Sequence, residues 1–369
     1  MIIKNAEIFG ENKKFSRGDL FIENGRFVDS AGGDVLDAEG LYAVPGLIDI
    51  HFHGCVGHDF CDADPQGLSA ISEYEASVGV TSICPATMSL SEEILLGVCN
   101  NAAAMRDKLA GAALVGINME GPFISMAKKG AQNPEYIMAP NSDMFERLQA
   151  ASGGLIRLCD LAPETEGALD FIDRHKGEVR LSIAHTTADY DTAAAAIAHG
   201  MSHITHLFNA MPPFNHRDPG VIGAAIDGGC EAELIADGVH IHPSVVRAAF
   251  RLFGERLILI SDSMMATGLA DGDYSLGGLP VKVAGNRATL ADGTIAGSAT
   301  NLMDCVRTAV QKMGIPLEDA LWAATAAPAK SIGIFDQRGS IRTGKVADLL
   351  LLDHDLRLQK VILRGELYN

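Results

Sequence analysis

Residues 44–55 read VPGLIDIHFHGC, an apolar stretch that ends on His51 and His53. Successive side chains of a strand point to opposite faces, so a strand here would place both histidines on one face. Two charged imidazoles side by side would repel each other, whereas neutral imidazole is the commonest metal ligand. The alternative is a hydrogen-bonded or surface pair of histidines, and the rest of the chain decides between the two interpretations.

Apolar strand candidates recur along the chain and alternate with stretches that have helical patterns, such as PQGLSAISEYEASVG, TEGALDFIDRHKG and PSVVRAAFRLFG. Two further helical stretches follow the last strand candidate. Eight strand–helix units in succession predict an α/β fold of the (β/α)8 TIM-barrel type. The strand candidates are Val44–His53, Val80–Pro85, Leu114–Glu120, Leu155–Leu161, Val179–His185, His203–His206, Ala232–Asp237 and Leu257–Asp262.

Short strand-like stretches occupy both ends of the chain, and Asn24-Gly25 is a typical hairpin turn between two of them. Strands at both termini around a different middle predict a small β-sandwich domain built from residues 1–44 and 338–369. The barrel is then expected to span residues 45–337.

Composition excludes several classes of function. The net charge of −18 over 369 residues argues against nucleic acid as a partner, and an anionic small substrate would need a local cationic pocket. No apolar run is long enough for a membrane span, and no signal peptide is recognisable. The seven cysteines are scattered without a C-x-x-C pair, which predicts reduced thiols and a cytoplasmic location.

Chemistry-bearing side chains coincide with the ends of the predicted strands, where TIM-barrel enzymes carry their active sites. Imidazole and carboxylate ligands suit zinc, iron, manganese or cobalt, so this ring predicts a site for one or two divalent metal ions. The residues at these ends are His51, His53, Glu120, His185, His206 and Asp262.

Some barrel hydrolases bridge two metals with a carboxylated lysine on the fourth strand, but that stretch, LIRLCDLAPE, contains no lysine. Glu120 is the available candidate for a bridge between two metals. Asp262 then serves better as a base that takes a proton from metal-activated water.

Several motifs resemble those of the N-acetylglucosamine-6-phosphate deacetylases of the amidohydrolase superfamily. They run in order from about residue 44 to residue 301 and, with the terminal strands, cover essentially the whole chain. The motifs are V-P-G-L-I-D followed by H-F-H-G, then M-E-G-P-F, K-K-G-A-Q-N-P, A-H-T-T, H-L-F-N-A-M-P-P, I-A-D-G-V-H and D-G-T-I-A-G-S.

This resemblance implies the roles of the metal-site residues. Glu120, His185 and His206 would hold the main metal, and His51 and His53 a second one that some family members have lost. The implied reaction is attack of metal-bound hydroxide on the acetamide. Asp262 would act as general base and then protonate the leaving amine, releasing glucosamine 6-phosphate and acetate.

The resemblance also implies a set of substrate ligands. The backbone of Asn209 and Ala210 would bind substrate, and Arg217 and His240 would bind the phosphate and the sugar. The arginine is expected to reach across from a neighbouring subunit, which implies a homodimer. Gln132 departs from the family, because many members have a histidine there beside the carbonyl; glutamine can donate a hydrogen bond but cannot carry a proton.

Two alternatives stay open. The first is another amidohydrolase, either an N-acetylgalactosamine-6-phosphate deacetylase or an enzyme of a different N-acyl substrate. The second is a non-catalytic scaffold on the same barrel, although such proteins typically lose metal ligands that this chain retains. Lys128 and Lys129 are interpreted as solvated surface, and Asp237 as a residue that could orient a ligand.

Overall fold

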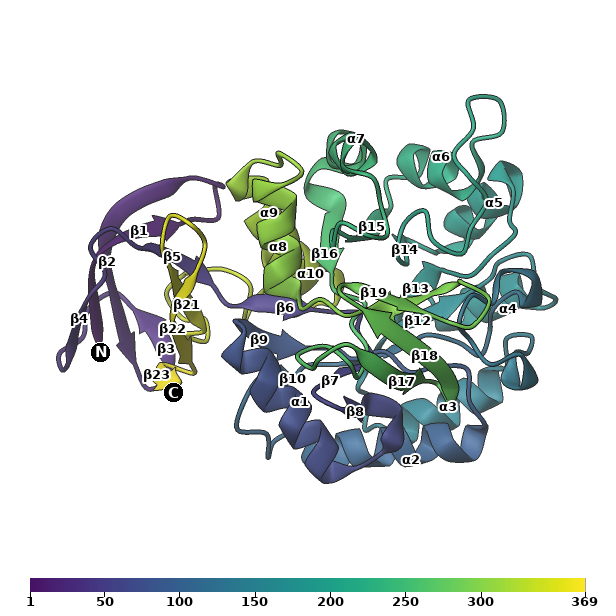
Figure 1. Ribbon diagram of the computed structural model, residues 1–369, viewed down its shortest axis with the longest axis horizontal. Coiled ribbons are helices and arrows are strands. Elements are labelled where there is room, and N and C mark those ends of the chain that lie inside the picture. The colour runs from purple at the N-terminus through teal and green to yellow at the C-terminus, as the bar shows by residue number, and fades with distance from the viewer. Residues whose placement is uncertain (369) are drawn as a thin grey trace.

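The computed structural model describes residues 1–368 and contains all of the predicted parallel strands. They form two sheets, in the orders β6–β9–β10 and β11 to β16, and every neighbouring pair in them is parallel. Figure 1 shows helices around these strands, as the crossovers between parallel strands require. The strands are β6 (Leu47–Asp49), β9 (Val80–Ile83), β10 (Ala113–Leu114), β11 (Ile117–Met119), β12 (Ile156–Leu161), β13 (Arg180–Ile183), β14 (His203–Ile204), β15 (Glu231–Ile235) and β16 (Leu257–Ile260).

Backbone hydrogen bonds also join the two sheets at the carboxyl ends of their strands. The backbone N–H of Asp262, after β16, donates to the carbonyl of His51, after β6, at 2.9 Å. The N–H of Thr87, after β9, donates to the carbonyl of Asn118 in β11 at 2.8 Å. The segments after the strands of both sheets therefore meet in one region, which is where the predicted site residues lie.

Six of the ten helices in residues 1–368 begin after a residue whose side chain caps them. In α1 the Asp64 side chain accepts hydrogen bonds from the N–H groups of Gln66 and Gly67, and Pro65 opens the first turn. Among residues 1–368, no helix is long and apolar enough to cross a membrane. The helices are α1 (Pro65–Ser77), α2 (Glu92–Met105), α3 (Ser142–Ala151), α4 (Ala168–His175), α5 (Tyr190–His199), α6 (Gly220–Asp227), α7 (Pro243–Phe253), α8 (Leu302–Gln311), α9 (Leu317–Ala324) and α10 (Ala326–Ser331).

Strands from both chain ends form one sheet of eight strands, beside the two termini at the left of Figure 1. The strands of the predicted small β-domain are continuously hydrogen-bonded into this one sheet. The reason is β1, which pairs with β2 along one edge and shares its other edge between β4 and β5, while β5 also pairs with β21. The strands are β1 (Ile2–Phe9), β2 (Phe15–Glu23), β3 (Arg26–Val28), β4 (Val35–Asp37), β5 (Tyr42–Pro45), β21 (Leu349–Leu352), β22 (Leu358–Leu363) and β23 (Glu366–Tyr368).

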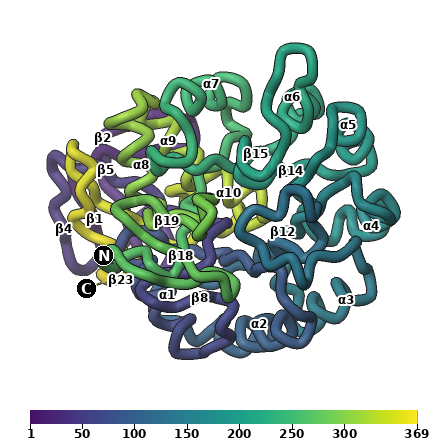
Figure 2. The backbone as a smooth tube through the Cα atoms, turned by 45° about the vertical axis from the view of Figure 1, so that its right-hand side comes forward, coloured from purple at the N-terminus to yellow at the C-terminus, as the bar shows by residue number. Residues whose placement is uncertain are grey.

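An antiparallel sheet that was not predicted from the sequence comes after β16. It consists of β17 (Gly272–Leu276), β18 (Leu279–Ala284), β19 (Arg287–Thr289) and β20 (Ile295–Ser298). Its buried side chains pack with Met88 and Met264 in a small apolar core of their own. In Figures 1 and 2 this insert lies over the parallel strands. A second small hairpin, β7 (Gly54–Cys55) with β8 (His58–Asp59), comes directly after His53.

Candidate active site

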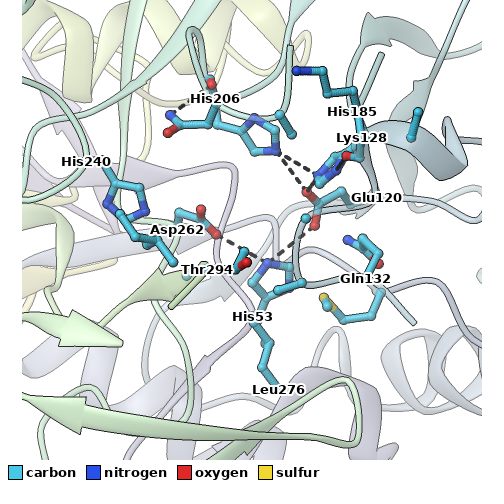
Figure 3. A pocket seen from close by; sticks show the side chains of 18 residues that line it. His53, Glu120, Lys128, Gln132, His185, His206, His240, Asp262, Leu276 and Thr294 are labelled. Carbon is cyan, nitrogen blue, oxygen red and sulfur yellow. Dashed lines mark hydrogen bonds and ion pairs between the residues drawn. The ribbon is translucent and has the colours of Figure 1, made fainter. Parts of the chain in front are cut away.

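A cavity of about 380 Å³ lies at the carboxyl ends of the parallel strands, and most of the predicted site residues line it. The unpredicted insert closes part of its wall with Leu276, Thr294, Ile295 and Gly297. Figure 3 shows Glu120 between His185 and His206 on one side and His53 on the other. The predicted residues in the lining are His53, Glu120, Gln132, His185, His206, Asn209, Ala210, His240 and Asp262.

Three of the site residues occupy the same position relative to their strands. His185, His206 and Asp262 each stand two residues after the last residue of β13, β14 or β16. Each has a positive φ, of 43°, 28° and 49° respectively. Non-glycine residues rarely adopt this left-handed conformation, and such local strain is found preferentially at functional sites.

The first cluster of potential ligand atoms lies on one oxygen of Glu120. Its Oε1 is 3.0 Å from His185 Nε2 and 3.1 Å from His206 Nε2. The two imidazole nitrogens are themselves 3.1 Å apart. His185 Nδ1 lies 2.8 Å from the carbonyl oxygen of Lys128, which can only accept a hydrogen bond. Nδ1 of His185 therefore carries a proton and donates it to this carbonyl.

The second cluster lies on the other oxygen of the same carboxylate. Glu120 Oε2 is 3.4 Å from His53 Nε2 and 3.6 Å from His51 Nε2. His53 Nε2 is in turn 3.3 Å from Asp262 Oδ1. Glu120 thus has one oxygen toward each cluster, the arrangement expected of a carboxylate that bridges two cations.

Electrostatics favours an ionised Glu120 despite its burial. Burial alone would raise the pKa of its carboxyl group. The positive charge of His51 and the hydrogen bonds from His185 and His206 outweigh burial, so this pKa lies well below its usual range. A permanently charged carboxylate at the centre of four imidazoles is suited to holding a cation.

The pKa values of His51 and Asp262 are likewise shifted so that each side chain favours its charged form. Burial lowers the pKa of His51, but the charges of Glu233 and Glu120 raise it well above the usual value. Burial raises the pKa of Asp262, but the hydrogen bond and charge of His53, together with the charge of His51, leave it lowered. The side chains alone therefore hold protons on imidazole beside ionised carboxylates, and a divalent cation can take the place of those protons.

Unpartnered buried atoms provide a further test of whether a metal fits. His51 Nε2 and Glu120 Oε2 are buried without any hydrogen-bond partner among the described residues, although buried polar atoms are nearly always paired. Both belong to groups of potential metal ligands, His51–Glu120–His206 and His51–His53–Asp262, whose ligand atoms lie within 4.8 Å of one another. The residues present thus fit a divalent cation.

The substrate side of the cavity contains groups that can recognise an anion. His240 Nδ1 lies 2.7 Å from Asp237 Oδ2, so Asp237 orients the imidazole, as the sequence suggested. Burial lowers the pKa of His240, but the hydrogen bond and charge of Asp237 outweigh this and raise it. Lys128 corrects our sequence interpretation: it is half-buried and lines the cavity, and its Nζ donates to the carbonyl of Met211 at 3.3 Å.

Arg217 is the one predicted substrate ligand that lies outside the cavity. It is exposed, and its guanidinium contacts the neighbouring His216 at 2.7 Å. Its segment, between β14 and α6, projects from the molecule in Figures 1 and 2.

Glu233, in the middle of β15, was not predicted from the sequence. Its side chain is fully buried and its Oε2 lies 2.8 Å from His51 Nδ1. The sequence signal that could have identified Glu233 is its charge inside the otherwise apolar stretch Ala232–Ile235. Thr294 was also given no role, although it stands in the D-G-T-I-A-G-S motif.

Comparisons with known proteins agree with this geometry. The profile of the amidohydrolase family matches residues 42–368. The N-acetylglucosamine-6-phosphate deacetylase of Bacillus subtilis is 37% identical over 100% of this chain and 96% of its own length. The human enzyme of that name is 34% identical, with 96% of this chain and 92% of its own covered.

A solved structure gives the same result in three dimensions. The Mycobacterium smegmatis N-acetyl-D-glucosamine-6-phosphate deacetylase, determined as a mutant in complex with N-acetyl-D-glucosamine-6-phosphate, superimposes with a TM-score of 0.93. It is 32% identical and covers 100% of this chain and 98% of its own. The chain therefore belongs to the amidohydrolase family, among relatives that are N-acetylglucosamine-6-phosphate deacetylases.

Proposed function

We propose that this protein deacetylates N-acetylglucosamine 6-phosphate, giving glucosamine 6-phosphate and acetate. The observation that carries the proposal is the position of Glu120, whose two oxygens face two histidine clusters in a cavity that also contains Asp262. Relatives at 32–37% identity over nearly the full chain carry the name of this activity. A non-catalytic scaffold is disfavoured because every expected ligand is retained.

Divalent metal is assigned to the two clusters. Glu120, His185 and His206 would hold the main ion, and His51 and His53 a second one, with Glu120 shared. When bound, the metal acts as a Lewis acid that polarises a carbonyl and lowers the pKa of water. Zinc, iron, manganese and cobalt all suit this donor set.

The side chains of this chain supply the proton transfers and the positioning. Asp262, ionised and at the edge of the clusters, accepts a proton from the attacking water and then delivers it to the amine nitrogen as the C–N bond breaks. Gln132 donates a hydrogen bond to the acetyl oxygen as negative charge develops there. The cavity walls, including the insert, exclude bulk water from the reacting groups.

The 6-phosphate and the sugar are assigned to the outer part of the cavity. The backbone of Asn209 and Ala210 and the His240 imidazole would bind them, with Arg217 supplied by the second subunit of a homodimer. The exposed position of Arg217 supports this, because it has no role in the cavity of its own chain. We infer a cytoplasmic location from the seven cysteines, all described and all free.

The architecture assigned to this function has two parts. We propose that the parallel strands close into a (β/α)8 barrel over residues 45–337, which the hydrogen bond from Asp262 to His51 supports. Residues 1–44 and 338–369 then form the small β-domain.

Product analysis tests the proposal. Purified protein incubated with N-acetylglucosamine 6-phosphate should release acetate and a primary amine in equal amounts. Removal of metal with a chelator should abolish release, and added Zn²⁺ or Co²⁺ should restore it. Acetate release that is unaffected by metal removal and by Asp262→Asn would contradict the proposed chemistry.

A further inference from the structure

Glu233 is a buried carboxylate to which the proposed reaction gives no task. It lies in β15 between Ala232 and Leu234, and its side chain is 0% exposed. Transfer of a carboxylate from water to such a site is unfavourable unless the carboxylate is paired. A carboxylate inside the strand layer therefore needs hydrogen-bond donors that compensate for its lost hydration.

The partners of Glu233 belong to both metal clusters. Its Oε2 accepts a hydrogen bond from the ring Nδ1 of His51 at 2.8 Å. The same oxygen accepts a second hydrogen bond from the backbone N–H of His206 at 3.2 Å. One atom thus holds the imidazole of a second-metal ligand and the backbone of a main-metal ligand.

The contact with His51 decides how that ring is protonated. A carboxylate oxygen accepts hydrogen bonds, so His51 carries a proton on Nδ1, and its Nε2, which faces Glu120 and Asp262, is the nitrogen left to bind a cation. Asn118 Nδ2 also lies 3.3 Å from this Nδ1, but an amide nitrogen is a donor and cannot accept the Nδ1 proton. Asn118 Nδ2 instead donates to the carbonyl of Ile50 at 3.3 Å. Glu233 is therefore the group that sets the His51 tautomer.

The contact with His206 sets a distance between the clusters. His206 has a φ of 28°, a conformation that needs support from its surroundings. One oxygen of Glu233 accepts hydrogen bonds both from the N–H of His206 and from the ring of His51. This shared contact fixes the position of the His51 ring relative to the His206 backbone. His206 keeps its other attachment to the main position through the Nε2 contact with Glu120.

We propose that Glu233 is a positioning residue on which the second metal position depends. It orients the His51 ring for metal binding and fixes the position of that ring relative to His206. The inference rests on the proposed function only in assuming that the clusters bind metal. Loss of Glu233 should weaken the second metal position far more than the main one, because it removes the carboxylate that orients the His51 ring, whereas at the main position it removes one backbone hydrogen bond of His206 and leaves His185 held by the carbonyl of Lys128. Residues that orient metal-ligating histidines are typically worth 10- to 100-fold in metal affinity.

The test is a Co²⁺ titration of the metal-stripped full chain, followed by absorbance and calorimetry. Wild type should bind two ions. Glu233→Gln should bind the first with wild-type affinity and the second about 10- to 100-fold more weakly. Glu231→Gln is the matched control. Glu231 lies two residues earlier in β15 and is half-buried. Its carboxylate lies 3.7 Å from Arg180, which is not one of the proposed metal ligands. Glu231→Gln should bind both ions like wild type.

A double-variant comparison separates positioning from general damage. With His51→Ala already present, Glu233→Gln should cause no further loss of metal, because the ring that it orients is gone. Equal weakening of both positions, no weakening, or a wild type that binds one ion would each overturn the inference. Should Glu233→Gln not fold, Glu233→Asp decides by the same criteria, since its shorter carboxylate cannot keep both hydrogen bonds.

Acetate release and metal binding distinguish a failure of this inference from a failure of the proposed function. Acetate release by wild type with unchanged metal binding in Glu233→Gln would overturn only this inference. A Glu233-dependent second metal in a protein that releases no acetate would overturn only the assigned reaction.

Discussion

The side-chain oxygen of Gln132 accepts a hydrogen bond of 2.6 Å from the backbone N–H of Ser89. Gln132 is 2% exposed and lines the cavity, so this bond fixes which end of its amide is free. With Oε1 engaged, the Nε2 donor remains for a ligand. In Figure 3 Gln132 lies close to Glu120, on the side of the cavity opposite His240.

Gln132→Leu should therefore lower kcat by about 10²–10³-fold, the usual effect of removing one preorganised donor from a developing oxyanion. KM should change little, because the lost hydrogen bond strengthens as charge develops on the acetyl oxygen. Steady-state kinetics with N-acetylglucosamine 6-phosphate measure both quantities. A variant with unchanged kcat and a raised KM would show that Gln132 binds the ground state only.

Asp262→Asn should keep the bound metal and lose about 10²–10⁴-fold in turnover, because asparagine can neither accept the proton of the attacking water nor deliver one to the amine. Metal content and kcat, measured on the same preparation, check both parts. Turnover near that of wild type would refute the role of Asp262 as base.

The candidate site residues at the strand ends could be predicted because each follows a recognisable apolar strand. A hydrophobic strand can be read from a sequence, and in a parallel fold the residues just after the strand must lie at the common carboxyl edge. His185, His206 and Asp262 were found in that way. The same reasoning could not assign their left-handed conformations, which depend on contacts between distant segments.

The missed features have physical reasons too. The apolar residues of the β17–β20 insert, such as Val281, pack with Met88 and Met264 in a core of their own. The eight predicted barrel strands are complete without them. α6 (Gly220–Asp227) is apolar on all sides and has no side-chain cap, and periodicity cannot assign such a run. Glu233 received no role from the sequence, because its role depends on His51, 182 positions away in the chain.

The cross-subunit role of Arg217 can be tested by complementation. Arg217→Ala and Asp262→Asn should each be nearly inactive alone. In a two-fold symmetric dimer, mixed and re-associated subunits should recover about a quarter of wild-type activity, because a heterodimer contains one site with both residues intact. An Arg217 that acts in its own chain would give no recovery, and a monomer in solution would contradict the proposed dimer.

The pH dependence of substrate binding should follow His240. Its raised pKa means that the imidazolium persists to higher pH than that of an ordinary histidine, and its attraction for the 6-phosphate is lost as pH rises through that pKa. KM of wild type should therefore rise as pH rises through the pKa of His240. His240→Asn should have a higher KM throughout and lack this rise; an identical pH profile in the variant would exclude His240 as a phosphate ligand.

The decisive measurement for the deacetylase assignment compares kcat/KM for acetate release from three sugars: N-acetylglucosamine 6-phosphate, N-acetylglucosamine and N-acetylgalactosamine 6-phosphate. We expect the phosphorylated glucosamine derivative to be preferred strongly over the unphosphorylated sugar and measurably over the galactosamine epimer. Preference for the epimer would reassign the substrate while leaving the chemistry intact. Release from none of the three by the metal-loaded protein would contradict the proposed deacetylase function.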